Sequence, residues 1–191
     1  MTCIVGYVEK GTVYMAADSA ASNGDSICVR RDLKLFNLKN MLIGFCGSFR
    51  IGQILKYVST IPKHPKGMDD HRFLCTHFVD YLIEVMEESR ALQDAGGVAS
   101  LGDDSQFLFG YKGVLYHFDN DMQVAVAETP YVSIGSGGQF ATGAMFAMAD
   151  IDIPPKDKLV KAVMAACENS VGVKPPVHVA IMDRKSCVKF L

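Results

Sequence analysis

The sequence lacks the features that would place this protein on a membrane or on nucleic acid. No apolar run approaches the roughly 18 residues of a membrane-spanning helix. The N-terminus has no charged segment followed by an apolar one, so no secretory signal peptide is expected. The formal net charge is −2, and no Lys/Arg cluster exceeds the pair Arg30-Arg31. We therefore expect a cytoplasmic protein that binds neither membrane nor nucleic acid.

Signals for metals and disulfides are also missing. Neither a CxxC nor an HExxH pattern occurs, so no metal site is expected. The six cysteines are scattered, mostly within apolar runs, where cysteines are usually reduced core residues. This pattern favours a protein without disulfides in a reducing compartment. None of the five histidines belongs to a pattern typical of a Ser-His-Asp triad, and no cofactor is predicted.

What the sequence does contain is a regular succession of strand and helix patterns. Its 191 residues, of which 49% are hydrophobic and 21% charged, suit one globular domain spanning residues 1–191. Apolar runs separated by short polar turns predict hairpins, and apolar residues at helical spacing predict helices. The hairpins are expected at 1–18, 33–46, 106–118 and 177–191, with a turn at Asn23-Gly24, short strands at 27–29, 124–126 and 131–134, and a loop at 95–104. The helices are expected from Ser48, from Asp69 or Asp70 to Arg90, at 139–149 and around 159–167.

The order of these elements indicates a fold class. Strand runs alternate with pairs of helices, which is typical of sheets packed together and covered by helices. The sequence therefore predicts a layered α+β domain. The first run carries a reactive hydroxyl, Thr2, at the mouth of a strand that is expected to be buried on both faces. Only Met1 stands between that residue and a free α-amino group.

Five short motifs, taken together and in order, resemble the proteasome β-type family of N-terminal nucleophile hydrolases. The motifs are Thr2-Cys3-Ile4-Val5-Gly6, Ala16-Ala17-Asp18-Ser19, Leu33-Lys34-Leu35-Phe36, Phe45-Cys46-Gly47-Ser48 and Ile134-Gly135-Ser136-Gly137-Gly138. The family includes archaeal-type β subunits and the bacterial ATP-dependent two-ring peptidase. The resemblance implies a four-layer αββα sandwich of two antiparallel sheets flanked by helix pairs.

The resemblance also implies a catalytic set: Thr2, Asp18, Lys34, Gly47 and Ser136. Thr2 would be the nucleophile, with its own α-amino group as the base once Met1 is removed. That amine has an ordinary pKa of about 7.7–8, so it can be neutral near physiological pH. Asp18 would pair with a buried Lys34 that activates the hydroxyl. Gly47 N–H would stabilise the oxyanion, and Ser136 would orient the amine.

Substrate contacts carried over from the family would involve Ala21, Asp32, Phe45 and Phe49. Two aromatic rings there would favour apolar or small side chains. One departure from the family lies in the segment from Asn169 to Val173, where archaeal members place an Asp and a Ser beside the N-terminal amine.

These residues predict a threonine endopeptidase that acts on peptides or unfolded proteins. The resemblance implies a homo-oligomeric ring, stacked on a second ring, and admits an ATPase unfoldase as a partner. Two alternatives stay open: an N-terminal nucleophile amidase acting on a small amide, and an unprocessed, inactive ring subunit that keeps Met1. The loop 135–138 lacks the Gly-Lys-Ser/Thr ending of a phosphate-binding loop, which argues against nucleotide binding.

Overall fold

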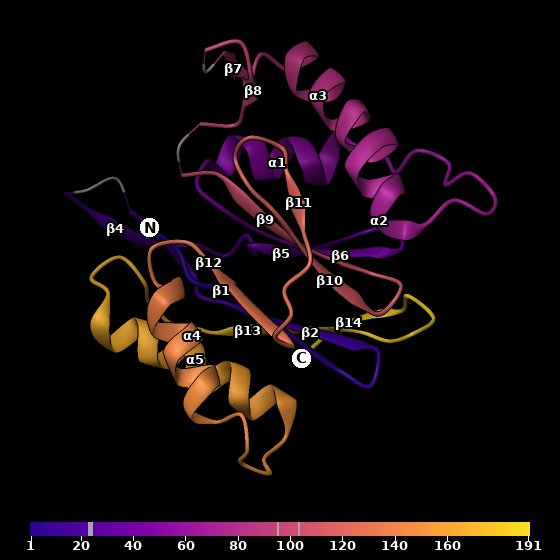
Figure 1. Cartoon of the computed structure of the whole chain (residues 1–191). Coiled ribbons are helices and arrows are strands. Elements are labelled where there is room, and N and C mark those ends of the chain that lie inside the picture. The colour runs from indigo at the N-terminus through magenta and orange to yellow at the C-terminus, as the bar shows by residue number, and fades with distance from the viewer. Residues whose placement is uncertain (23–24, 95, 103) are drawn as a thin grey trace.

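Two five-stranded antiparallel sheets lie face to face, and helices cover the outer face of each (Figure 1). The structure, a computed structural model, describes residues 1–22, 25–94, 96–102 and 104–191. Its layers run helices, sheet, sheet, helices, which confirms the predicted αββα sandwich. The turn predicted at Asn23-Gly24, and residues 95 and 103 of the predicted loop, lie outside the described residues.

The first sheet contains the N-terminal hairpin, and its strand order is β12-β1-β2-β13-β14. Lys10 and Gly11 turn the chain between the first two strands, both with positive φ (50° and 73°), as the tight hairpin requires. The strands are β1 (Ile4–Glu9), β2 (Thr12–Ala17), β12 (Tyr131–Ile134), β13 (His178–Met182) and β14 (Val188–Phe190).

The second sheet has the order β11-β10-β9-β6-β5. Its strands are β5 (Leu35–Leu38), β6 (Met41–Cys46), β9 (Gln106–Tyr111), β10 (Val114–Phe118) and β11 (Val124–Ala125). Two short ribbons flank the sheets: β3 (Ala20–Ser22) pairs with β4 (Ile27–Val29), and β7 (Gln93–Asp94) pairs with β8 (Ala99–Ser100). The four predicted hairpins are therefore all present.

The helices begin where the sequence places their caps. The Ser48 hydroxyl accepts the Ile51 N–H at 3.5 Å, and the Asp69 carboxylate accepts the Arg72 N–H at 2.9 Å. The elements are α1 (Phe49–Tyr57), the run of α2 (Asp70–Phe73), a π-helical turn (Leu74–Phe78) and α3 (Val79–Glu88), then α4 (Gly138–Ala147) and α5 (Pro155–Asn169). Among the described helices, none has the length and apolar composition needed to cross a membrane.

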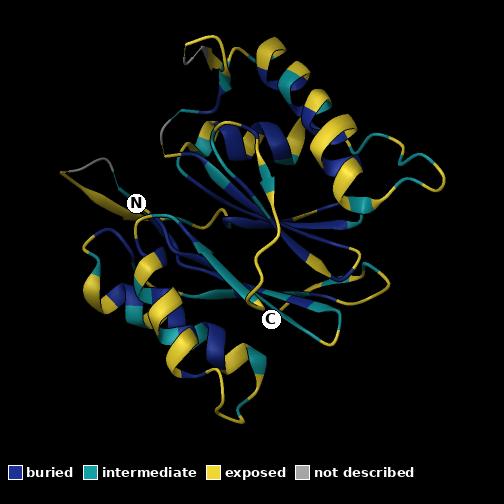
Figure 2. Ribbon diagram, in the orientation of Figure 1, coloured by how far each residue is buried: buried dark blue, intermediate teal, exposed yellow. Residues whose placement is uncertain are grey.

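The interior is divided into three apolar layers, and β6 is buried along its whole length (Figure 2). One layer lies between α1–α3 and the second sheet, one between the two sheets, and one between the first sheet and α4–α5. Strand β6 contributes side chains to two of these layers, because alternate side chains of a strand point to opposite faces of the sheet. Ile43 and Phe45 face the helices, whereas Leu42 and Cys46 face the other sheet.

Candidate active site

Thr2 lies just before β1 and is held by the loop that precedes α4. The Thr2 N–H donates to Ser136 Oγ at 3.2 Å, and the Thr2 carbonyl accepts the Gly137 N–H at 3.0 Å. The Thr2 hydroxyl donates to the Met1 carbonyl at 2.7 Å, and the residue is only 3% exposed. The backbone around the hydroxyl is therefore fixed by contacts that do not involve the side chain itself.

A buried ion pair lies next to this segment. Lys34 Nζ donates to Asp18 Oδ1 at 2.6 Å, and the two side chains are 2% and 0% exposed. The same carboxylate accepts the N–H groups of Cys3 at 3.0 Å, Ala20 at 2.9 Å and Lys174 at 3.3 Å. The Asp18 carboxylate thus accepts four hydrogen bonds, and it connects Lys34 to Cys3, the residue that follows Thr2.

Burial lowers the pKa of Lys34 below its ordinary value, and the neighbouring Asp18 carboxylate acts in the opposite direction. A lysine in this setting gives up its proton more readily than one in water. It can therefore both stabilise a developing negative charge and take part in proton transfer.

Two thiols near the site do not compete with the hydroxyl as nucleophiles. Burial raises the pKa of Cys3 to about 12 and that of Cys46 to about 11. Both therefore remain protonated at neutral pH, and a neutral thiol is a poor nucleophile. This leaves Thr2 as the nucleophile that the N-terminal segment offers.

Gly47 connects β6 to α1 in a conformation that favours glycine. Its φ is +84°, and a Cβ at this position would collide with the Asp104 carbonyl oxygen. Within the part of the chain that the structure describes, its N–H has no hydrogen-bond acceptor. A backbone N–H that is free, and rigidly placed, is the kind of donor that can stabilise an oxyanion.

Thr2, Gly47 and Ser136 line one cleft of about 650 Å³. This volume is typical of ligand-binding clefts. The remaining lining residues are Met1, Ser22, Cys46, Ser48, Gln93, Leu101, Gly102, Asp104, Ser105, Gln106 and Gly135. The structure thus brings the predicted nucleophile, oxyanion donor and amine-orienting serine together, and places the Asp18–Lys34 pair beneath the same segment.

Comparison with known proteins assigns this architecture. No family model matches the sequence. Among solved structures, BPH of Thiobacillus denitrificans in complex with epoxomicin superposes with a TM-score of 0.81 at 20% identity, covering 95% of this chain and 98% of that one. The eukaryotic HslV of Trypanosoma brucei gives 0.66 at 20% identity, covering 94% and 98%. The Gly-1 mutant of Anbu from Hyphomicrobium sp. strain MC1 gives 0.71 at 17% identity, covering 100% and 87%.

The chain has the fold of the proteasome-like N-terminal nucleophile hydrolases. In this chain β1 begins two residues after Thr2, which lines the cleft.

Three of the four expected substrate-contact residues lie together, in a pocket separate from the cleft at Thr2. Asp32, Phe45 and Phe49 line a separate pocket of about 60 Å³ against α1, and the two rings meet edge to face at 5.6 Å. The Asp32 carboxylate forms an ion pair with Arg30, and Ala21 pairs with Cys28 in the β3–β4 ribbon. The cleft at Thr2 is lined by none of the four. The reason is geometric: Phe45 is on the helix-facing side of β6.

The segment that departs from the family pattern leaves no acid beside Thr2. The Asn169 amide donates to the Ala165 carbonyl at 2.8 Å, at the end of α5. The Ser170 N–H donates to Ala166, and Val173 is fully buried in the α4–α5 layer. Ser136 is therefore the side chain that contacts the Thr2 nitrogen among the described residues.

One wall of the cleft was not foreseen from the sequence. It is built by Gln93, Asp104, Ser105 and Gln106, together with Leu101 and Gly102. The Ser105 hydroxyl, 3% exposed, accepts the Ser48 N–H at 3.4 Å and so joins this wall to the segment that carries Gly47. No local pattern indicates these positions. Gln106, for example, reaches the cleft because β9 pairs with the distant strand β6, which places it opposite Cys46.

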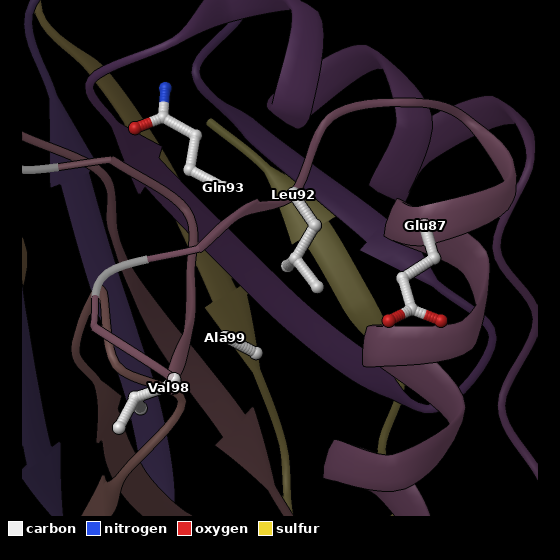
Figure 3. A pocket seen from close by; sticks show the side chains of 6 residues that line it. Glu87, Leu92, Gln93, Val98 and Ala99 are labelled. Atoms are coloured by element: carbon white, nitrogen blue, oxygen red, sulfur yellow. The ribbon is translucent and has the colours of Figure 1, made fainter.

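A second cavity, of about 500 Å³, lies beside the β7–β8 ribbon (Figure 3). Leu92 and Glu87 project from one side, and Val98 and Ala99 from the ribbon. Its lining contains no hydroxyl or thiol group. The cleft at Thr2 is therefore the better candidate for chemistry.

Proposed function

We propose that this chain is a threonine peptidase subunit that cleaves peptide bonds with Thr2 after Met1 has been removed. The observation that carries the proposal is the buried Asp18–Lys34 pair, which is hydrogen-bonded to the backbone N–H directly after Thr2, a residue that lines the same cleft as Gly47. A buried ion pair is costly to form, so its attachment to the residue after a hydroxyl nucleophile supports a chemical role.

The proposed reaction follows from these positions. The free Thr2 amine takes the hydroxyl proton, and Oγ1 attacks the peptide carbonyl carbon. Gly47 N–H stabilises the oxyanion, and loss of such a donor typically costs about 2.7–4 kcal/mol. When the C–N bond breaks, the leaving amine receives the proton and an ester remains on Thr2. Water then attacks the ester, which releases the acid and restores the hydroxyl.

Met1 keeps the site silent while it is attached. The Thr2 nitrogen is then a secondary amide, which cannot act as a base, and its N–H is directed at Ser136. The Met1 carbonyl accepts the Thr2 hydroxyl, and the Met1 side chain fills the space beside Gly172. Removal of one residue would therefore free the base and the nucleophile together.

We expect processed protein to be labelled at Thr2 by epoxomicin, the compound bound to the similar BPH structure. Intact mass should show the loss of one Met and the gain of one inhibitor, and peptide mapping should place the adduct on Thr2. A sample expressed with methionine aminopeptidase inhibited should retain Met1 and remain unlabelled. Processed protein that does not react with epoxomicin and cleaves none of a broad panel of peptides would contradict the proposal.

That negative result would favour the second reading, an inactive ring subunit. One observation points toward it: the segment 169–173 offers no carboxylate to the N-terminal amine, because Asn169 caps α5 and Val173 is buried. The small-amide alternative has no specific support in the cleft.

We further propose that the subunits form a closed homo-oligomeric ring, stacked on a second ring, with peptides or unfolded proteins as substrates and an ATPase unfoldase as a partner. An isolated subunit would leave the Thr2 cleft open to any protein, whereas a closed ring encloses it. Exposed apolar side chains support contacts between copies. Tyr57, the last residue of α1, is 72% exposed, and Phe146 on α4 is 75% exposed.

Sedimentation velocity at micromolar concentration should therefore give a particle many times the 20.8 kDa subunit mass. Replacing Phe146 by Asp should reduce the size of that particle. Lys161→Asp, at an exposed position of α5, is the control for a change of charge on the same layer of helices. A wild-type monomer under these conditions would rule out the ring.

A further inference from the structure

One wall of the Thr2 cleft, formed by the first residue of β9 and the two residues before it, is polar, and it determines what kind of side chain the cleft can accept. Asp104, Ser105 and Gln106 follow one another along this wall, and Gln93 of the β7–β8 ribbon lies beside them. The inference drawn from this wall rests on the proposed peptidase function and concerns its substrate class.

The amide of Gln106 has a fixed orientation. Its Nε2 donates to Asp119 Oδ1 at 3.0 Å, and because a carboxylate only accepts, the amide nitrogen must face it. The amide oxygen, Oε1, is thereby turned toward Cys46 Sγ at 3.9 Å. A thiol is a weak donor, so Oε1 retains most of its capacity to accept a hydrogen bond from a ligand in the cleft.

Asp104 gives the same wall its charge. Among the described lining residues it carries the one ionised side chain, and it is exposed. Within the described part of the chain, its carboxylate has no ion-pair partner. Lys34 does not neutralise it, since that ammonium is buried against Asp18. Asp104 and Gln106 therefore bring an acidic residue and an oriented amide oxygen to the cleft. The cation among the described lining residues is the N-terminal ammonium, which donates to Ser22 Oγ.

The pocket formed by Phe45 and Phe49 is separate from the cleft and smaller than it. Its volume is about 60 Å³, against about 650 Å³ for the cleft, and it opens against α1. The polar wall therefore offers a substrate side chain the larger space beside Thr2.

We propose that the cleft selects peptides that carry a lysine or arginine side chain, with the Asp104 carboxylate and Gln106 Oε1 as the acceptors. Asp119 acts as the positioning residue, because it determines which end of the Gln106 amide faces the cleft. A cationic side chain brings several N–H donors to acceptors that this wall leaves unpaired, and an aliphatic side chain would leave them unsatisfied.

The test uses fluorogenic tetrapeptides in which Arg, Lys, Leu or Glu is placed in turn at each position before the scissile bond. At one of these positions, kcat/KM should be about tenfold higher for Arg and Lys than for Leu, with Glu slowest, the size expected for one charge-assisted hydrogen bond. Asp104→Asn should remove most of that preference, and Asp104→Lys should reverse it in favour of Glu. Asp152→Asn, an exposed carboxylate near α4 and α5, should leave every ratio unchanged.

The proposed roles of Asp119 and Gln106 are tested by a separate kinetic measurement. Gln106→Leu and Asp119→Asn should raise KM for the basic peptides while KM for Leu peptides and kcat stay near wild type. A merely structural role for Asp119 would instead lower kcat for all peptides alike.

The substrate preference and the peptidase activity can fail independently. Fluorescence anisotropy with Thr2→Ala protein measures binding of the Lys and Leu peptides without cleavage. If wild-type protein cleaves Leu peptides faster than Lys peptides, and Asp104→Asn does not change the ratio, the preference is overturned and the peptidase stands. If nothing is cleaved but Thr2→Ala protein still binds Lys peptides more tightly, the chemistry fails and the cleft's selectivity stands. Equal binding of the two peptides in that case overturns both.

Discussion

Thr2→Ala is expected to abolish peptide hydrolysis in a subunit that folds and assembles as before. In the proposed reaction the side chain supplies the nucleophile, and its loss should lower kcat by at least about 10²–10⁴-fold. The fold should persist because the contacts that hold this residue use its backbone: the N–H to Ser136 and the carbonyl to Gly137. Hydrolysis rates test the loss of activity. The sedimentation coefficient and the midpoint of thermal unfolding test whether the variant still assembles and folds.

The matched control is Thr2→Ser, which keeps a hydroxyl and the α-amine. It should keep measurable activity and epoxomicin labelling, both of which Thr2→Ala loses. Hydrolysis by Thr2→Ala at the wild-type rate would show that another group does the chemistry. A midpoint lowered by many degrees would show that Thr2 is a structural residue.

Lys34→Ala should inactivate the enzyme and destabilise the subunit together. The substitution leaves the Asp18 carboxylate buried without its counter-charge, and breaking a buried pair in this way typically costs about 3–5 kcal/mol. Three backbone donors, from Cys3, Ala20 and Lys174, remain on the carboxylate, so we expect the lower part of that range. Urea denaturation measures the free energy of unfolding, and peptide turnover measures the activity.

Two further variants separate charge from chemistry. The double variant Lys34→Met with Asp18→Asn removes both charges and should regain stability without regaining activity. Lys34→Arg keeps the charge but should not restore turnover, because the larger guanidinium does not fit a site that is 2% exposed and does not release a proton. An active Lys34→Arg enzyme would reduce Lys34 to a structural charge.

Local chemistry explains why most of the fold could be predicted from the sequence. Hairpins follow from positive-φ turns such as Lys10-Gly11, and helix starts follow from caps such as Ser48 and Asp69, which act within three residues of their own position. The residues gathered around Thr2 could also be named in advance, although only by resemblance. Nothing local indicates that Asp18 and Lys34, 16 residues apart, form an ion pair.

The residues that line the cleft could not be predicted in the same way. Strand β6 is apolar on both faces, so its hydrophobicity does not reveal which side chains point to the helices and which to the cleft. Phe45 faces α1 and its neighbour Cys46 lines the cleft, and a shift of one residue separates the two outcomes. Gln106 is opposite Cys46 only because β9 pairs with β6. Such long-range pairing has no signature in a single stretch of sequence.

The hydrogen bonds to Asp18 also make the site a late product of protein synthesis. Its donors come from Cys3 and Ala20 at the start of the chain, from Lys34, and from Lys174, 156 residues after the carboxylate. Ser136, which holds Thr2, is likewise made in the last third of the chain. A ribosome-bound fragment that ends before α5 therefore carries the nucleophile without its complete support. A truncated or unfinished subunit should for this reason be harmless to the proteins around it.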